Sequence, residues 1–180
     1  MLRKPSKCMK KLLLTVLIVV SVTTMFAQVA SRANLIQGKR ETLSVGQDAP
    51  DFTATDVHGN EFRLSSLKGK YVVLDFWGSW CKWCIKGFPE MKEAYAELKG
   101  KNVEFVGIAC KDQPDKWRKT VADNELPWIN VVNGKNPDIT QIYFVKGYPT
   151  KIIIDPQGTI VNVTLGESPE FYLTLKQLIK

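Results

Sequence analysis

Residues 75–89 read DFWGSWCKWCIKGFP and place two cysteines, Cys81 and Cys84, two residues apart. They follow residues 71–77 (YVVLDFW), an apolar run that is interrupted by a single acid. Such a run is typical of a central strand that is covered on both faces. The cysteine pair is therefore expected just beyond the end of a buried strand.

A helix is predicted directly after the first cysteine. Apolar residues recur at spacings of three or four from Ile85 to Leu98, which gives a helix one apolar face, and Gly100 is a typical helix end. Pro89 lies inside this pattern and is expected to kink the helix. Cys81 would stand at the helix start, where free N–H groups and the helix dipole favour thiolate over thiol.

This arrangement suits thiol–disulfide exchange. An accessible Cys81 would attack a substrate disulfide, and a shielded Cys84 one turn later would resolve the mixed disulfide. Two other interpretations are weaker. A structural disulfide would close too small a loop to restrain the unfolded chain much. A zinc site would need two more ligands, for which Cys110 and His58 are the candidates, and the sequence has no second CxxC.

Asp75 is the acid that interrupts the apolar strand. If it is buried there without a cation, its pKa should rise, which would make it a proton acceptor near neutral pH. The proton to be moved is that of Cys84, because its thiolate must form before it can resolve the mixed disulfide. The alternative is that Asp75 lies at a sheet edge and is solvated.

The rest of the pattern alternates strands with helices and predicts an α/β fold with a mixed sheet and helices on both faces. Further strands are expected at 51–55, 61–64, 103–109, 129–132, 150–155 and 159–164, of which the first two and the last two form hairpins. Further helices are expected at 114–124, at 137–144 and after Ser168, which would cap the last helix with Pro169 at its first position.

Length and charge fit one exported domain. The chain of 180 residues is 44% hydrophobic, enough to bury a core, and carries a formal charge of +7. Five basic residues and no acid lie in residues 1–27, which leaves 20 basic against 18 acidic residues in the body. We therefore expect no nucleic-acid or membrane patch on the body.

The N-terminal segment reads as a targeting signal. Residues 12–31 carry no charge, and their strongly apolar part, residues 12–22, has the length of a signal-peptide core rather than of a membrane span. We interpret residues 1–30 as a signal peptide or an uncleaved anchor, 31–45 as a tether and 46–180 as the folded domain. Either way the body is expected to be periplasmic or otherwise extracytoplasmic.

Other candidate residues are weaker. Cys8 precedes the apolar segment and would leave with it or stay inside, so the exported part keeps one unpaired cysteine, Cys110. Cys110 is expected to be a small core residue, with a third redox thiol as the lesser alternative. His58 is expected on the surface of a turn, and Trp117 and Trp128 are expected to serve packing rather than docking.

Two segments resemble the thioredoxin superfamily. "VVLDFWGSWCKWC" is similar to its active-site strand and turn, and "GYPTKIIIDPQG" resembles the segment in which a cis-proline faces the cysteine pair. The opening from residue 45 to the cysteines resembles more narrowly the exported TlpA/ResA-like thiol:disulfide oxidoreductases. The resemblance covers residues 45–180 and implies a thioredoxin fold with an N-terminal β-hairpin and an insertion within 111–144. It implies these roles: Asp75 as the buried acid, Trp80 as the active-site tryptophan, Cys81 as the nucleophile, Cys84 as the resolving cysteine, and Pro149, preceded by Tyr148, as the cis-proline.

The chain also departs from that pattern. The residues between the cysteines are Lys82 and Trp83, where the family usually has a proline before the second cysteine. Lys82 should stabilise the adjacent thiolate, which predicts a reduction potential less reducing than that of thioredoxin, and Trp83 should offer an apolar contact to a partner peptide. Some exported relatives carry a buried glutamate three residues after the second cysteine, where this chain has Gly87.

Together these features predict an exported oxidoreductase that reduces protein disulfides with Cys81 and Cys84, without a metal or another cofactor. The expected partners are protein disulfides or dithiols and a membrane electron donor, with an N-terminal anchor as one option. The backbone of Tyr148 beside Pro149 is expected to pair with the substrate. Rival interpretations are a disulfide-introducing oxidase, a thiol peroxidase and a non-catalytic binding module.

Overall fold

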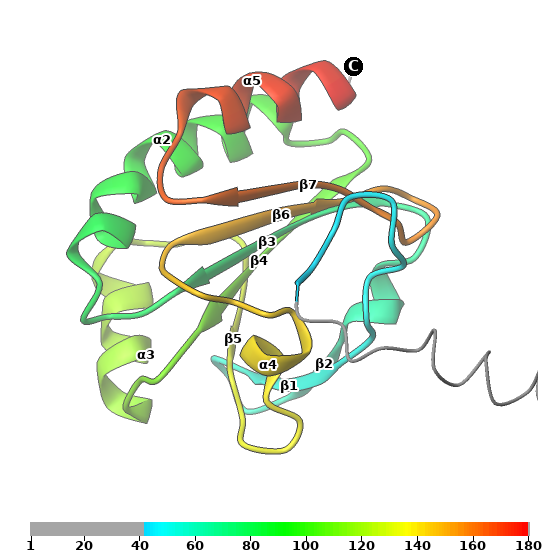
Figure 1. Cartoon of the computed structure of the whole chain (residues 1–180). Coiled ribbons are helices and arrows are strands. Elements are labelled where there is room, and N and C mark those ends of the chain that lie inside the picture. Colours follow the sequence, from blue (N-terminus) through cyan, green and yellow to red (C-terminus); the bar gives the residue numbers. More distant parts are fainter. Residues whose placement is uncertain (1–41, 180) are drawn as a thin grey trace, which may run out of the picture. The chain divides into compact units, whose positions relative to one another are not determined.

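Seven strands form one mixed sheet in the computed structural model, which describes residues 42–179 (Figure 1). The strand order is β2-β1-β5-β4-β3-β6-β7. The central strand β3 pairs in parallel with β4 and antiparallel with β6, and β1 and β2 form an antiparallel hairpin at one edge. The strands are β1 (Thr53–Asp56), β2 (Glu61–Arg63), β3 (Tyr71–Trp77), β4 (Val103–Ala109), β5 (Ile129–Val132), β6 (Thr150–Ile154) and β7 (Ile160–Leu165).

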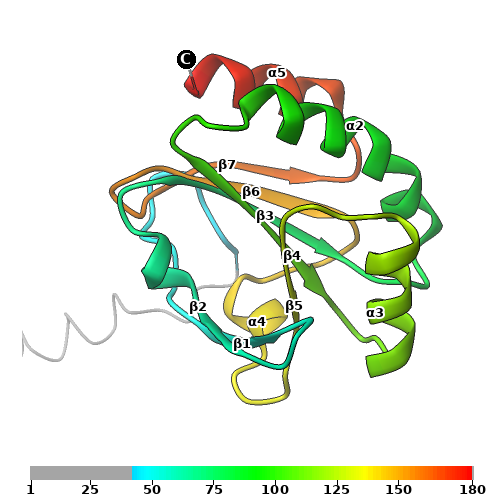
Figure 2. The same ribbon diagram turned by 180° about the vertical axis from the view of Figure 1, so that it is seen from behind.

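Helices cover both faces of this sheet. Helices α2 and α5 lie side by side over one face in both ribbon views (Figures 1 and 2). The helical elements are η1 (Leu64–Leu67), α2 (Lys82–Leu98), α3 (Pro114–Asp123), α4 (Ile139–Ile142) and α5 (Pro169–Leu178). The α/β class and the mixed sheet predicted from the sequence are therefore confirmed.

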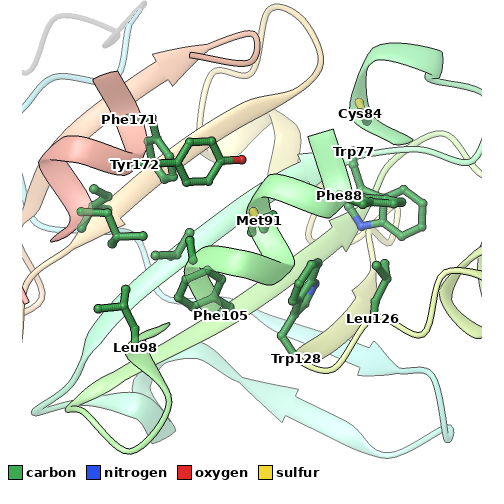
Figure 3. Packing of buried hydrophobic residues seen from close by; sticks show 14 of the residues in the cluster. Trp77, Cys84, Phe88, Met91, Leu98, Phe105, Leu126, Trp128, Phe171 and Tyr172 are labelled. Carbon is green, nitrogen blue, oxygen red and sulfur yellow. The ribbon is translucent and has the colours of Figure 1, made fainter. Parts of the chain in front are cut away.

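The core consists of two hydrophobic clusters, one on each face of the sheet. Successive side chains of a strand point to opposite faces, so Val73 and Trp77 of β3 join the cluster under α2 and α5, whereas Leu74 and Phe76 join the cluster on the other face. Figure 3 shows the first cluster, with side chains from α2, α5 and the strands meeting between the helices and the sheet. Asp75 alternates with Val73 and Trp77 and therefore points toward α2.

Several element predictions need correction at their ends. The predicted helix 137–144 is limited to Ile139–Ile142, because the side chain of Asp138 caps its first turn and Phe144 takes a left-handed backbone conformation with φ of 49°. Ser168 stands at the start of α5, but its hydroxyl donates to the Glu170 carboxylate and caps no backbone N–H group.

The N-terminal predictions for residues 1–30 lie outside the described residues, as does most of the tether at 31–45. Among the residues that the structure describes, no helix has both the length and the apolar character needed to cross a membrane.

Candidate active site

Cys81 and Cys84 form a disulfide at the start of α2, beyond the end of β3. Cys81 is the N-cap residue of this helix, and its sulfur accepts a hydrogen bond from the backbone N–H of Cys84 at 3.2 Å. An N–H group directed at this sulfur stabilises negative charge on it. The predicted position of Cys81 at a helix start is confirmed.

The two cysteines differ less in exposure than the sequence suggested. Cys81 is 6% exposed and Cys84 is 1% exposed, and both pack into the hydrophobic cluster under α2. The expected accessible sulfur is therefore largely covered in this oxidised form, although Cys81 remains the more exposed of the two.

The turn that carries Cys81 is held by hydrogen bonds within itself and to residues that follow β4. The Cys81 backbone N–H donates to the Gly78 carbonyl at 2.9 Å. Gly78 has no side chain, and an added Cβ would overlap the indole of Trp80. That indole donates its Nε1–H to the carbonyl of Cys110 at 3.0 Å, which ties the turn to the end of β4. The Ser79 hydroxyl donates to Asp112 at 2.7 Å.

Aromatic side chains lie exposed around the disulfide. Trp80 is 51% exposed and Trp83 is 69% exposed, and exposure was expected for Trp83. The Trp80 ring packs edge to face against Tyr148, with 5.2 Å between the ring centroids. This contact brings the loop before β6 beside the cysteine turn, although the two are far apart in the sequence. The bond between Tyr148 and the buried Pro149 is cis, as the resemblance implied.

Exposed lysines accompany these rings. The Lys86 ammonium lies 5.4 Å from the centroid of Trp83, and the Lys111 ammonium lies 5.8 Å from that of Tyr148. Lys82, the first residue of α2, is exposed directly beside Cys81. We call the residues Trp80, Lys82, Trp83, Lys86, Lys111 and Tyr148 the aromatic–basic rim. This rim offers apolar faces and positive charge around the sulfur pair.

Asp75 is buried, at 1% exposed, so the alternative of a solvated edge residue is wrong. Its expected isolation from cations is also wrong. Asp75 stands opposite Lys151 in the antiparallel register of β3 and β6, and the Lys151 ammonium donates to its carboxylate at 2.9 Å. A second carboxylate, that of Glu167, lies 3.1 Å from the same ammonium.

We call Asp75, Lys151 and Glu167 the buried triad, although the Glu167 side chain remains 22% exposed. Of its members, only Asp75 was predicted from the sequence. Burial by itself would lower the pKa of Lys151, but the carboxylates of Asp75 and Glu167 outweigh it and raise that pKa. Burial raises the pKa of Glu167, and the negative charge of Asp75 adds to this effect, while Lys151 opposes it. Glu167 therefore holds a proton at higher pH than an ordinary glutamate does.

Cys110 is fully buried and makes no disulfide. Its thiol donates to the Ile108 carbonyl at 3.3 Å, and burial raises its pKa to about 12. A thiol that stays protonated in the core is a poor nucleophile, so Cys110 is a core residue as predicted. His58 is exposed and Trp117 and Trp128 are buried, which confirms a surface role for the first and packing for the other two.

The sulfur pair lies in neither of two hollows that the surface of residues 42–179 contains. One is lined by residues of η1 and of the β6–β7 turn, among them Leu64 and Gln157, and the other includes His58 and Trp128. Within the same residues, no group of three or more His, Cys, Asp or Glu side chains is arranged to hold a metal ion.

Comparisons with known proteins agree with this geometry. Residues 45–163 match the AhpC/TSA family. The chain is 35% identical to the thiol-disulfide oxidoreductase ResA of Bacillus subtilis over 140 residues, which cover 76% of each chain. It is also 35% identical to ResA of Bacillus cereus over 128 residues, covering 71% of this chain and 73% of the relative.

Solved structures point to the same class of protein. The thioredoxin domain of a thiol-disulfide oxidoreductase from Bacteroides vulgatus superposes with a TM-score of 0.72 at 31% identity, covering 77% of this chain and 100% of that one. A thiol:disulfide interchange protein from Bacteroides sp. gives a TM-score of 0.69 at 32% identity, covering 76% of this chain and 91% of that one.

Proposed function

Because this chain belongs to the AhpC/TSA family and is a thiol-disulfide oxidoreductase with a thioredoxin-like fold, we propose that it is exported and reduces disulfide bonds of proteins. The observation that carries the proposal is the Cys81–Cys84 pair at the start of α2, with a backbone N–H directed at the Cys81 sulfur. The aromatic–basic rim supports a protein substrate, since the exposed Trp80 and Trp83 and the half-buried Tyr148 are residue types enriched at surfaces that bind polypeptides.

The proposed cycle begins with the reduced protein. The Cys81 thiolate attacks one sulfur of a substrate disulfide, the substrate S–S bond breaks, and the electron pair leaves on the other substrate sulfur, which takes up a proton. The Cys84 thiol then loses its proton to the buried triad, in which Asp75 is the proposed acceptor. The Cys84 thiolate attacks the Cys81 sulfur and the bond of the mixed disulfide breaks. The second substrate sulfur leaves as a thiolate that takes up a proton, and the disulfide seen in this structure is formed.

Two electrons and one proton must then return to the pair, because the cycle begins with Cys81 as a thiolate and Cys84 as a thiol. We propose a dithiol donor at the membrane as their source, which would approach Cys81 over the aromatic–basic rim, as a substrate would. In an oxidising compartment a reductase of this kind would keep selected thiols reduced, for example the haem-attachment cysteines of apocytochrome c, which would make it a cytochrome c maturation factor.

Export is supported by the basic start and the uncharged residues 12–31. A C-terminally tagged full chain should become accessible to protease when the outer barrier of the cell is opened and the inner membrane is intact. Protection under those conditions would contradict export.

The direction of electron flow is tested with purified reduced and oxidised protein. We expect the reduced form to reduce insulin catalytically with dithiothreitol as donor, and the oxidised form to introduce disulfides into reduced ribonuclease at least tenfold more slowly. The opposite ranking would identify an oxidase. Rapid consumption of hydrogen peroxide would identify a thiol peroxidase instead.

A further inference from the structure

One turn after the resolving cysteine, helix α2 has a residue without a side chain, Gly87. A side chain from another part of the chain occupies the space. Gly87 follows Cys84 by three residues, so the two lie on the same face of the helix. Gly87 is buried, and a Cβ added there would overlap the carboxyl group of Glu167. The carboxyl that no α2 side chain provides at this place comes from the loop between β7 and α5.

Glu167 is held in this place from two sides. The hydroxyl of Tyr172 on α5 donates to its Oε2 at 3.1 Å, and the ammonium of Lys151 lies 3.1 Å from its Oε1. The hydrogen bonds of that ammonium go to Asp75 and to the sulfur of Met91, so within residues 42–179 the buried Oε1 accepts no hydrogen bond. The Oε2 atom of Glu167 is thus hydrogen-bonded to Tyr172, whereas the Oε1 atom is held only by its ion pair with Lys151.

We propose that Glu167 is a positioning residue for the resolving step: by sharing Lys151 with Asp75, its carboxyl keeps the buried triad able to accept the Cys84 proton. With one cation between two carboxylates, the ionised triad carries a net negative charge in a buried place, which uptake of one proton neutralises. If Asp75 alone faced Lys151, the pair would already be neutral and would take up a proton less readily.

The other charged groups near Glu167 support this assignment. Lys151 reaches it from β6, Asp75 acts on it from β3, and Tyr172 contacts it from α5. Glu90 on α2 adds negative charge beside Tyr172. Burial and these negative charges raise the pKa of Tyr172 far above its ordinary value, so its hydroxyl remains a donor. Among these neighbours Lys151 is the single cation, and both carboxylates depend on it.

The proposal rests on thiol–disulfide exchange by Cys81 and Cys84 and is independent of export and of the direction of electron flow in the cell. Resolution of a mixed disulfide with a fluorescent peptide is measured in single turnover from pH 5 to 9 for the full chain and for Glu167→Gln. We expect resolution at pH 7 to be at least tenfold slower in Glu167→Gln. The matched control is Glu93→Gln, which changes an exposed glutamate of α2 and should leave the rate unchanged.

The rate of the first step, attack by Cys81, distinguishes a specific role of Glu167 in resolution from a general disturbance of the active site. Attack by Cys81 needs no proton acceptor, so Cys84→Ser and Cys84→Ser/Glu167→Gln should form the mixed disulfide at rates within about threefold of each other. If Glu167→Gln resolves as fast as the unaltered protein at every pH, or if attack and resolution slow equally, the proposal is wrong.

Supplying the carboxyl from a different residue tests whether its position, rather than Glu167 itself, is what the resolving step requires. Glu167→Ala should resolve slowly, and Gly87→Glu/Glu167→Ala, which offers a carboxyl from α2, should recover at least a third of the lost rate. A double variant no faster than Glu167→Ala would overturn the proposal.

A measurement on the unaltered protein covers the case in which these variants do not fold. The Glu167 carboxyl is titrated by NMR with ¹³C-labelled glutamate in the oxidised and reduced forms. We expect its midpoint to differ between the two forms by at least half a pH unit, and equal midpoints would contradict the coupling.

Discussion

Asp75 on β3 and Lys151 on β6 stand directly opposite each other in the sheet, with 2.9 Å between carboxylate oxygen and ammonium nitrogen. Both side chains are almost fully buried beneath α2, the helix that carries the cysteine pair. An unpaired charge at either place would be costly, whereas the ion pair compensates both charges. Glu167 adds a second anion, so the ionised triad carries a net negative charge. Lys151 is therefore the one cation that compensates both carboxylates of the triad.

Lys151→Met is expected to lower the free energy of unfolding by about 3–5 kcal/mol, because it leaves the buried Asp75 and the partly buried Glu167 without a cation. Urea unfolding of the oxidised proteins measures this loss. The matched control is Lys176→Met, which removes an exposed ion pair with Glu97 and should cost less than about 1 kcal/mol. Equal losses in the two variants would show that Lys151 does not compensate the carboxylates.

The raised pKa of Glu167 predicts a specific dependence of stability on pH. The folded state holds the Glu167 proton more tightly than the unfolded state, whose pKa is near 4.5. The resulting stability is fully present below pH 4.5 and is lost as the pH rises through the pKa of the folded state. The free energy of unfolding should therefore fall, relative to that of Glu167→Gln, as the pH rises above 4.5. A difference between the two proteins that stays constant, or that grows with pH, would contradict the raised pKa.

The sequence predicted the elements that carry the site better than it predicted the triad. The runs 71–77 and 103–109 became β3 and β4 with the expected bounds, because central strands that are covered on both faces are apolar throughout. Asp75 was recognisable because it interrupts such a run. Lys151 interrupts the start of β6 in the same way, but its partner follows from the strand register, which local pattern does not define.

Glu167 could not be predicted from the sequence for a different reason. It lies in a loop without periodicity, and its neighbour Gly87 is 80 residues earlier in the chain. The one usable signal was the missing side chain at position 87, where the resemblance led us to look for a glutamate. Which residue fills such a gap depends on tertiary packing.

Lys82 and the helix start predict a reduction potential less negative than that of thioredoxin, which is about −270 mV. Positive charge beside Cys81 stabilises its thiolate, and a stabilised reduced form makes the protein a stronger oxidant. Equilibration with glutathione measures the potential, and Lys82→Gln should make it more negative. Lys86→Gln, one turn further along α2, should have a smaller effect. A potential below that of thioredoxin, or no difference between the two variants, would show that Lys82 does not control the sulfur pair.

Trp83 is expected to bind protein substrates without taking part in the sulfur chemistry, since its ring is 69% exposed beside the disulfide. Trp83→Ala should lower kcat/KM for insulin about five- to tenfold, the loss typical of an exposed aromatic contact, and should leave the reaction with a small aromatic disulfide nearly unchanged. Leu173→Ala is the matched control, because Leu173 is a similarly exposed apolar residue on α5, outside the rim. If Trp83→Ala slows both substrates equally, its ring acts on the cysteine pair itself, and if it slows neither, substrates dock elsewhere on the surface.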